Sequence, residues 1–224
     1  MGKTQIVSAQ EAAKVIKDGM TVMVGGFMNN GSPRDLIKAI CDAGAKDLTI
    51  VCNDCGFVGV GAGALLANGQ VKKLIASHVG LNKQVAEKYN AGELELVLQP
   101  QGTLAEQIRA AGAGLGGVIT PTGMGTIVAE GKDTIVIDGK EYLVEKPIHA
   151  DVAVIGAYMA DETGNAIYKG STRNFNVLMA SAADTVIVAA EHIVPAGEIG
   201  PDHVETPHIF VDYLVQETNI GEFE

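Results

Sequence analysis

The sequence contains no tryptophan, only 4% aromatic residues and three cysteines among its 224 residues. It also has few basic residues, with 16 lysines and arginines against 27 aspartates and glutamates and a formal net charge of −11. Because neutralising phosphates requires a basic face, this balance argues against a nucleic-acid-binding protein. A small, odd number of cysteines is typical of a reduced protein rather than a disulfide scaffold.

Long apolar runs are missing as well. No stretch of about 18 uninterrupted apolar residues is present and the first ten residues lack an apolar signal segment, so we expect neither a membrane span nor export. The hydrophobic content of 47% is ample for a packed core, and the 19% charged content is low for a coiled coil. Length and composition therefore predict a cytoplasmic, acidic, glycine-rich α/β protein with a single domain over residues 1–224.

The first half of the chain alternates between helical and extended patterns. Ser8 and Glu11 form a capping box for a helix over 8–17, and Pro33 is suited to start a second helix. The other expected elements are strands at 20–24, 48–52, 71–76 and 94–98 and helical stretches at 62–67 and 83–89. Strands separated by helices predict βαβ units and a mainly parallel sheet with flanking helices.

In the second half of the chain, the predicted helices and strands no longer alternate regularly. Thr103 and Glu106 form a further capping box, which predicts a helix that begins after a short loop. Asp138-Gly139 between two alternating segments predicts a hairpin. The remaining expected elements are strands at 151–156, 185–189 and 209–215 and a helix at 174–183. The predicted fold class is α/β, with a mainly parallel sheet, flanking helices, mixed strands and a hairpin in the second half.

The segment 24–33, with the sequence VGGFMNNGSP, lies between a predicted strand and a predicted helix. Glycine at such a place lets the backbone approach a ligand, and the N–H groups of a helix start face an anion. The segment is not a Walker-type phosphate loop, because Ser32-Pro33 replaces the Lys-Ser/Thr pair, and it is not the G-x-G-x-x-G fingerprint. On spacing alone, an ordinary tight turn is as good an interpretation as a ligand-binding loop.

A second loop, over residues 98–103, follows another predicted parallel strand, at the edge where open α/β sheets place their ligands. Gln101, held between Pro100 and Gly102, is suited to aim its carboxamide N–H at a developing oxyanion. The alternative, a glutamine that only satisfies loop backbone groups, is favoured by spacing alone.

Other kinds of chemistry have weaker signals. Cys52 and Cys55 have no second ligand pair for zinc and no helix start with proline for a redox motif, so a thiol redox protein is only a third hypothesis. Ser171 and Ser181 have no adjacent base, and Arg173 suits a carboxylate ligand or a structural ion pair equally well. No metal-ligand spacing connects the histidines, which are His78, His149, His192, His203 and His208. We therefore expect no metal site.

Several separate motifs follow one another along nearly the whole chain. They are Asp18-Gly19 before an apolar run, Gly25-Gly26-Phe27 with Gly31 and Pro33, IASHVGLN (75–82), PQGTLAEQIRAAGAGLGG (100–117), TPTGMGT (120–126), DETGNAIYKGSTRNFN (161–176) and GPDHVETPHIFVD (200–212). In this order they resemble the α (A) subunit of family I CoA-transferases. Within that family they look most like the acetate or butyrate–acetoacetate type, and less like the succinyl-CoA:3-oxoacid type.

The resemblance implies covalent catalysis by a glutamate, which attacks an acyl-CoA thioester to give an acyl-glutamyl anhydride and then a glutamyl-CoA thioester. In the family this glutamate lies in a Ser-Glu-Asn-Gly motif of the β subunit. No Glu-Asn-Gly occurs in this chain, so we assign it no nucleophile. The implied partner is a β subunit in an α₂β₂ assembly. The implied substrates are acyl-CoA and short-chain carboxylates, with coenzyme A as a substrate rather than a permanently bound cofactor.

The same resemblance implies site residues. Gln101, which matches the family's Pro-Gln-Gly-Thr, is the expected oxyanion-hole donor across a subunit interface, and Asn53 and Gly102 are expected to bind substrate. The residues expected to contact coenzyme A, with backbone amides that can hold an anion without a basic surface, are Gly25, Gly26, Phe27, Met28, Asn29, Asn30 and Gly31. The sequence departs from the family at His208, where relatives have glycine, and at Asp54-Cys55.

Two alternatives to the acetate or butyrate–acetoacetate type remain open. One is the α subunit of a succinyl-CoA:3-oxoacid CoA-transferase, since one methylene in an apolar pocket changes binding by only about 1–3 kcal/mol. The other alternative belongs to a different class, a non-catalytic module that binds coenzyme A or a nucleotide. It is motivated by the missing nucleophile and by the glycine-rich loop.

Overall fold

A computed structural model of the chain describes residues 4–219. The strands are β1 (Gln5–Ile6), β2 (Thr21–Val24), β3 (Leu48–Cys52), β4 (Val71–Ala76), β5 (Glu95–Leu98), β6 (Val118–Thr120), β7 (Thr134–Ile137), β8 (Lys140–Glu145), β9 (Ala150–Asp161), β10 (Ala166–Ile167), β11 (Ala183–Val194) and β12 (Tyr213–Gln216). The α-helices are α1 (Ala9–Ala13), α2 (Arg34–Ala43), α3 (Ala62–Ala67), α4 (Lys83–Asn90), α5 (Gln101–Gly112) and α6 (Asn176–Ser181). Short 3₁₀ turns lie at Ile127–Ala129, Gly170–Arg173, Pro201–His203 and His208–Phe210.

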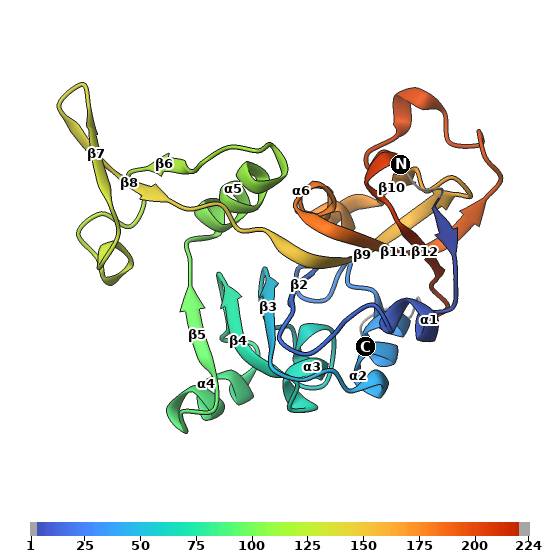
Figure 1. The fold of residues 1–224 in the computed structure, drawn as a ribbon, viewed down its shortest axis with the longest axis horizontal. Helices are drawn as coiled ribbons and strands as arrows, with labels where there is room; N and C mark the ends of the chain where they lie inside the picture. The colour runs from blue at the N-terminus through green and yellow to red at the C-terminus, as the bar shows by residue number, and fades with distance from the viewer. Residues whose placement is uncertain (1–3, 220–224) are drawn as a thin grey trace.

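Within the described residues, the main sheet has nine strands, in the order β1-β12-β11-β9-β2-β3-β4-β5, with β10 paired to β9 (Figure 1). Its strands pair in parallel, except that β10 is antiparallel to β9. A second, antiparallel sheet has three strands in the order β6-β8-β7. The predicted fold class is therefore confirmed.

Helices cover both faces of the main sheet, as a parallel sheet requires. α1 to α4 pack on one face, and α5 and α6 pack on the other (Figure 1). Successive side chains of β2 point to opposite faces of the sheet. Val22 and Val24 therefore pack in the core with α1 to α4, and Met23 packs in the core with α5 and α6. Among residues 4–219, we find no helix with the length and apolar character needed to cross a membrane.

Several local signals of the sequence are confirmed. Ser8 and Glu11 form the predicted capping box, with the Glu11 amide 3.2 Å from the Ser8 hydroxyl and the Ser8 amide 3.0 Å from the Glu11 carboxylate. The helix ends at Ala13 rather than at residue 17, because the amides of residues 14 to 16 bond to the carbonyls three residues earlier, which tightens the chain into turns. In the predicted hairpin, Asp138 and Gly139 have φ values of 51° and 77°, as a type I′ turn requires.

The capping box expected at Thr103 and Glu106 is wrong. Helix α5 begins two residues earlier, at Gln101, because Pro100 takes the extended N-cap conformation with φ −54° and ψ 137°. Thr103 is buried inside the first turn, and Glu106 pairs instead with Arg109, one turn further along the helix. Gln101, expected in a loop, is therefore a helical residue.

Four other elements differ from the prediction by two residues or more at one end or both. β9 and β11 each have 12 residues, twice or more the length expected, because they pair with each other from Ala183 to Val194. Helix α6 begins at Asn176 rather than at 174, since Asn174 has a φ of 25° and cannot be helical. The last strand begins at Tyr213, because a 3₁₀ turn takes up part of the segment expected to extend from 209.

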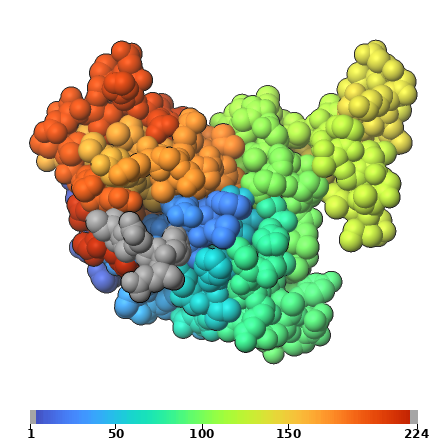
Figure 2. All heavy atoms as spheres, turned by 180° about the vertical axis from the view of Figure 1, so that it is seen from behind, coloured from blue at the N-terminus to red at the C-terminus, as the bar shows by residue number. Residues whose placement is uncertain are grey.

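Residues 118–146, called the arm below, project from the body of the protein (Figure 2). The arm consists of the β6-β8-β7 sheet and its connections, and β7 forms its outer edge. All four residues of β7 are exposed, and Ile127 in the preceding turn is 82% exposed. The arm therefore contacts the body at its opposite end, where β6 lies beside α5 (Figure 1).

Two carboxylates fix the start of α2, the helix that follows the glycine-rich loop. Glu217 is 6% exposed and accepts the Asp35 amide at 3.1 Å. Asp35 in turn accepts the Thr218 amide at 2.8 Å. Burial raises the pKa of Glu217 to about 7, even though the Asp35 amide favours its charged form. Burial would also raise the pKa of Asp35, but hydrogen bonds from Thr218 outweigh it and lower that pKa below its ordinary value.

The raised pKa of Glu217 predicts a pH-dependent stability. Its ordinary value is 4.5, so the protonated side chain stabilises the fold fully below pH 4.5, and this contribution is lost as the pH rises through about 7. We expect the free energy of unfolding of the wild type to fall relative to that of Glu217→Gln between pH 5 and pH 8, by on the order of 2 kcal/mol. Urea unfolding of both proteins at the two pH values measures this. An unchanged difference would contradict it.

Candidate active site

Four loops line the carboxyl edge of the parallel sheet. They follow β2, β3, β4 and β5, which are neighbours in the sheet, and they begin at Gly25, Asn53, Ser77 and Gln99. Hydrogen bonds connect neighbouring loops: the Met28 amide donates to the Asp54 carboxylate at 2.9 Å, and the Ser77 amide donates to the Asn53 carbonyl at 2.9 Å. The edge is therefore a continuous row of loops, on the side of the sheet where ligands of open α/β folds bind.

The loop after β2 also lies where the direction of the chain through the sheet reverses. β2 continues to β3 on one side, whereas its other neighbour, β9, continues to β11 on the opposite side. Beside this reversal is a cavity of about 430 Å³, whose lining includes Asn30, Gly31, Pro33, Gly156 and Thr172. A crevice at such a reversal is the usual ligand site of an open α/β sheet, which makes this edge the candidate active site.

The Asn176 side chain clamps the loop to the sheet. It is fully buried, accepts the Gly26 amide at 3.0 Å, and donates to the carbonyls of Gly31 at 2.9 Å and Gly156 at 3.1 Å. Asn174 donates to the Asn30 carbonyl at 3.1 Å. Both asparagines come from the start of α6, so a segment far away in the sequence fixes the shape of the loop.

This clamp requires glycine at three positions. A Cβ on Gly25 would lie 2.5 Å from the Asn176 side-chain oxygen, and a Cβ on Gly156 would lie 2.7 Å from the Gly31 carbonyl oxygen. At Gly31, with a φ of 81°, a Cβ would lie 2.3 Å from the carbonyl oxygen of Thr172. These contacts give a packing reason for the glycine spacing that the sequence shows.

The tip of the loop has a strained backbone. Met28 and Asn29 have φ values of 48° and 64°, a region that residues other than glycine seldom adopt. The Asp54 carboxylate holds this tip, since it accepts the Met28 amide at 2.9 Å and the Gly56 amide at 2.8 Å. Strain of this kind occurs preferentially at binding sites, where surrounding contacts maintain it.

The backbone amides of this loop are largely engaged inside the protein. The amides that donate to internal partners are those of Gly25, Gly26, Phe27, Met28 and Asn30. The expectation that loop amides hold an anion is therefore not met by these five groups in this arrangement. The tip instead presents the side chains of Phe27 and Met28, which are 48% and 38% exposed. Contact between this loop and coenzyme A stays a prediction.

Gln101 is the first residue of α5 and is exposed at the same edge. Gly102 follows it in the first turn and is also exposed. β5 is the third neighbour of β2, so at about 4.8 Å per strand Gln101 lies on the order of 14 Å along the edge from the glycine-rich loop. The structure thus brings Asn53, which is buried, next to the loop and leaves Gln101 further along the row.

The cysteines are unsuited to redox chemistry. Cys52 and Cys55 are buried free thiols, and burial raises the pKa of Cys52 well above its ordinary value and that of Cys55 to about 12. Since the thiolate is the reactive form, these thiols are poor nucleophiles. Within residues 4–219, no group of three or more histidine, cysteine, aspartate or glutamate side chains is arranged to hold a metal ion.

Two other polar residues have structural partners. Arg173 forms an ion pair with Glu205, with 2.7 Å between Nε and Oε1. This contact favours the structural interpretation of Arg173 over a ligand-binding one. His208, one of the departures from the family pattern, donates its amide to the Asn165 side chain at 3.0 Å. It therefore stabilises a turn far along the chain from Gln101.

Sequence reasoning missed the supporting residues of the site. Asp54 stands out in the sequence only as a departure from the family, although an acid directly after a buried strand is a signal for a loop contact at the sheet edge. Asn176 gives no signal of its own, because its partners in the loop after β2 are about 150 residues away in the sequence. A separation of 33 residues likewise hides the contact in which Lys132 donates to the Gln99 side-chain oxygen at 3.2 Å.

Comparison with known proteins gives a consistent result. The coenzyme A transferase family model matches residues 6–217. The chain belongs to the coenzyme A transferase family. This confirms the resemblance drawn from the motifs and the enzyme class expected from it.

Curated relatives of this family member match over almost their whole length. The alpha subunit of the acetate CoA-transferase of Escherichia coli K12 is 49% identical over 95% of this chain and 97% of the relative. The corresponding subunit of a probable succinyl-CoA:3-ketoacid coenzyme A transferase of Bacillus subtilis is 51% identical, covering 96% and 90%. The alpha subunit of the acetoacetyl-CoA:acetate/butyrate CoA transferase of Clostridium acetobutylicum is 48% identical, covering 96% and 98%.

A solved structure shows the same fold in a longer polypeptide. The acyl-CoA transferase of Escherichia coli O157:H7, in a thioester complex with CoA, aligns with a TM-score of 0.85 and 25% identity. The alignment covers 98% of this chain and 48% of that one, so this CoA-transferase family member spans about half the length of that protein.

The clamp formed by Asn176 predicts a large loss of stability in Asn176→Ala. The substitution leaves the Gly26 amide and the Gly31 carbonyl without their side-chain partner, and we expect a loss of about 2–4 kcal/mol. Urea unfolding measures it. As a control, Asn90→Ala on the exposed end of α4 should change stability by less than about 0.5 kcal/mol. Equal effects of the two substitutions would contradict the role of Asn176.

Proposed function

We propose that this chain is the α subunit of a short-chain acyl CoA-transferase, which exchanges coenzyme A between acetate, butyrate or acetoacetate and their thioesters. The observation that carries the proposal is the exposed Gln101 in the first turn of α5, at the carboxyl edge of the sheet. The names of the relatives from Escherichia coli and Clostridium acetobutylicum support this choice of substrates.

Gln101 serves as the oxyanion-hole donor. When a nucleophile attacks a thioester carbonyl, negative charge develops on the oxygen, and a fixed carboxamide N–H stabilises that charge. The position of Gln101 strengthens this effect, because the first N–H groups of the 12-residue helix α5 lack intrahelical partners and carry the positive end of its dipole. The residue and the helix terminus therefore favour an anion at the same place.

A glutamate from a β subunit supplies the nucleophile, since no Glu-Asn-Gly occurs in this chain. Its carboxylate attacks the thioester carbonyl and the C–S bond breaks, which gives an acyl-glutamyl anhydride and CoA thiolate. The thiolate then attacks the glutamyl carbonyl and releases the first carboxylate. An incoming carboxylate attacks the carbonyl of the glutamyl-CoA thioester and displaces the CoA thiolate, which gives a new acyl-glutamyl anhydride. The thiolate then attacks the acyl carbonyl of this anhydride, so the new acyl-CoA leaves and the glutamate is regenerated.

The remaining proposed site residues come from the resemblance to the family, and their positions in the row of loops support them. Asn53 and Gly102 contact the substrate at the ends of β3 and β5, and the loop over residues 25–31 contacts coenzyme A, with the exposed Phe27 and Met28 at its tip. The assembly is an α₂β₂ heterotetramer in the cytoplasm, where the three free cysteines stay reduced. Coenzyme A acts as a substrate and is not bound permanently.

A second candidate is the succinyl-CoA:3-oxoacid exchange, favoured by the 51% identity with the Bacillus subtilis relative of that name. The two candidates differ only in the acyl pocket, and kcat/KM for acetate, butyrate and succinate distinguishes them. A non-catalytic module that holds a nucleotide on the loop amides is less favoured, because internal partners engage the amides of Gly26, Met28 and Asn30.

The missing nucleophile predicts that the purified chain is inactive alone. Activity should appear when a β subunit containing Ser-Glu-Asn-Gly, encoded in the neighbouring reading frame, is added, because that chain supplies the attacking carboxylate. Transfer of CoA from acetoacetyl-CoA to acetate, followed by chromatography of the acetyl-CoA formed, measures this. Robust transfer by the single chain would overturn the proposal.

The oxyanion role predicts that Gln101→Ala lowers kcat of the reconstituted complex by about 10²–10³-fold. The KM for acyl-CoA should change little, because the donor acts mainly on the transition state. Gln10→Ala, which removes an exposed glutamine from the first turn of α1, is the matched control and should leave kcat unchanged. An unchanged kcat in Gln101→Ala would remove the oxyanion assignment.

A further inference from the structure

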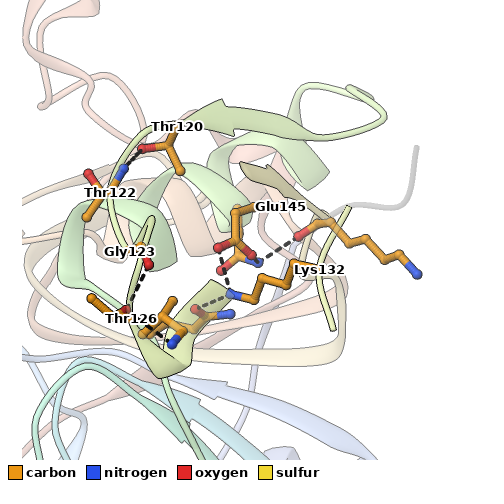
Figure 3. Close-up of polar contacts among 10 residues, drawn as sticks. Thr120, Thr122, Gly123, Thr126, Lys132 and Glu145 are labelled. Atoms are coloured by element: carbon orange, nitrogen blue, oxygen red, sulfur yellow. Dashed lines mark hydrogen bonds and ion pairs between the residues drawn. The ribbon is translucent and has the colours of Figure 1, made fainter. Parts of the chain in front are cut away.

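A largely buried ion pair within the arm contacts the short loop that leads from β5 into α5. Lys132 lies before β7, and its Nζ is 2.7 Å from Oε1 of Glu145 at the end of β8 (Figure 3). The same Nζ donates to the Gln99 side-chain oxygen at 3.2 Å. Glu145 is 2% exposed and Gln99 is 9% exposed, whereas the Lys132 side chain is 23% exposed, so the contact is largely shielded from solvent. Gln99 is separated from Gln101 only by Pro100.

The same carboxylate also contacts the middle of α5. Gln107, which is 4% exposed, donates its Nε2 to the second oxygen of Glu145 at 3.4 Å and to the Lys146 carbonyl at 2.9 Å. The Ile148 amide donates to the Gln107 carbonyl at 3.1 Å. Helix α5 is therefore attached to the arm at two points, just before its first residue and six residues into it.

Such a contact is costly as a means of stabilisation. Removing an ammonium and a carboxylate from water costs several kcal/mol per ion, and well-packed apolar residues often stabilise a fold as much or more. A hydrogen-bonded ion pair does, however, fix the relative orientation of its two side chains, because its donors and acceptors permit few geometries. The Lys73–Glu95 pair between β4 and β5 differs from the Lys132–Glu145 pair in its exposure. Its two charged atoms are also 2.7 Å apart, but its side chains lie partly in solvent.

Pro100 links the orientation of Gln99 to that of Gln101. Its ring fixes φ, at −54° here, which removes one of the two backbone rotations between the peptide before it and the peptide after it. The Gln99 amide is already bound to the Ala76 carbonyl at 3.0 Å, and Lys132 adds a second attachment through the side chain. Fixing Gln99 at both its backbone and its side chain therefore fixes the orientation at which α5 and Gln101 begin.

We propose that Lys132 is a positioning residue for Gln101: held by Glu145, it fixes Gln99 and thereby the oxyanion donor two residues later. The inference rests on the proposed role of Gln101. Lys132 acts through the backbone start of α5 and does not itself contact the reacting atoms. Because a displacement of about 1 Å in a catalytic group can cost about 10²-fold in rate, loosening this attachment lowers kcat even when the fold is intact.

A double-mutant cycle in the reconstituted α–β complex tests this. Lys132→Met should lower kcat by about 10-fold or more, with KM for acyl-CoA changed less than about twofold. In a Gln101→Ala background, Lys132→Met should have no further effect, because residues that act as a unit are not additive. Lys132→Arg, which keeps the charge and the donors, should restore most of kcat. Lys73→Met, which removes the exposed ion pair beside β5, should leave kcat unchanged.

A further variant covers the case in which Lys132→Met fails to fold, since it leaves the Glu145 carboxylate buried without its partner. Gln99→Met keeps the Lys132–Glu145 pair and removes only the contact to the loop, and it should give the same non-additive loss of kcat.

The outcomes separate this inference from the proposed function. If Gln101→Ala lowers kcat but Gln99→Met and Lys132→Met leave it unchanged, or lower it equally in both backgrounds, the positioning role is overturned and the role of Gln101 stands. If Gln101→Ala leaves kcat unchanged, the oxyanion assignment fails, and the positioning role fails with it.

Discussion

The buried carboxamide of Asn176 is the contact on which the arrangement of the candidate site depends. It joins the loop after β2, through Gly26 and Gly31, to Gly156 in β9. These two strands are neighbours whose chains continue in opposite directions through the sheet. This side chain satisfies backbone groups from both halves and so stabilises the reversal, beside which the cavity lies.

The acidic character of the chain is compatible with this site because the structure uses its carboxylates as internal acceptors. Asp54 binds the amides of Met28 and Gly56, and Glu217 binds the amide of Asp35. Each of these carboxylates takes backbone donors that an anionic ligand would otherwise compete for. The start of α5, by contrast, keeps first-turn N–H groups without intrahelical partners, and this helix terminus favours negative charge.

The parts of the fold that could be predicted from the sequence depend on near neighbours. The Ser8 capping box, the turn at Asp138-Gly139 and the bounds of β3, α3 and β4 all match, since each signal is contained within a few residues. The capping box at Thr103 failed because Pro100 offered a competing helix start. The contacts of Asn176 with the loop after β2 could not be predicted, because asparagine is common on surfaces and these partners lie 145 to 150 residues away. Gln101 was already a candidate from its position after a predicted strand, the family motif favoured it as the oxyanion donor, and its helical position required the structure.

The exposed strand β7 has a consequence for the behaviour of the free chain. It is the edge of its sheet, so one side of its backbone is left without a strand partner among the described residues, while Ile135, Val136 and Ile137 offer apolar side chains beside it. Such an edge is a template for pairing with another molecule, and proteins oppose this with charges at the strand ends. Asp133 and Asp138 flank β7 and place a negative charge beside each end of this exposed edge.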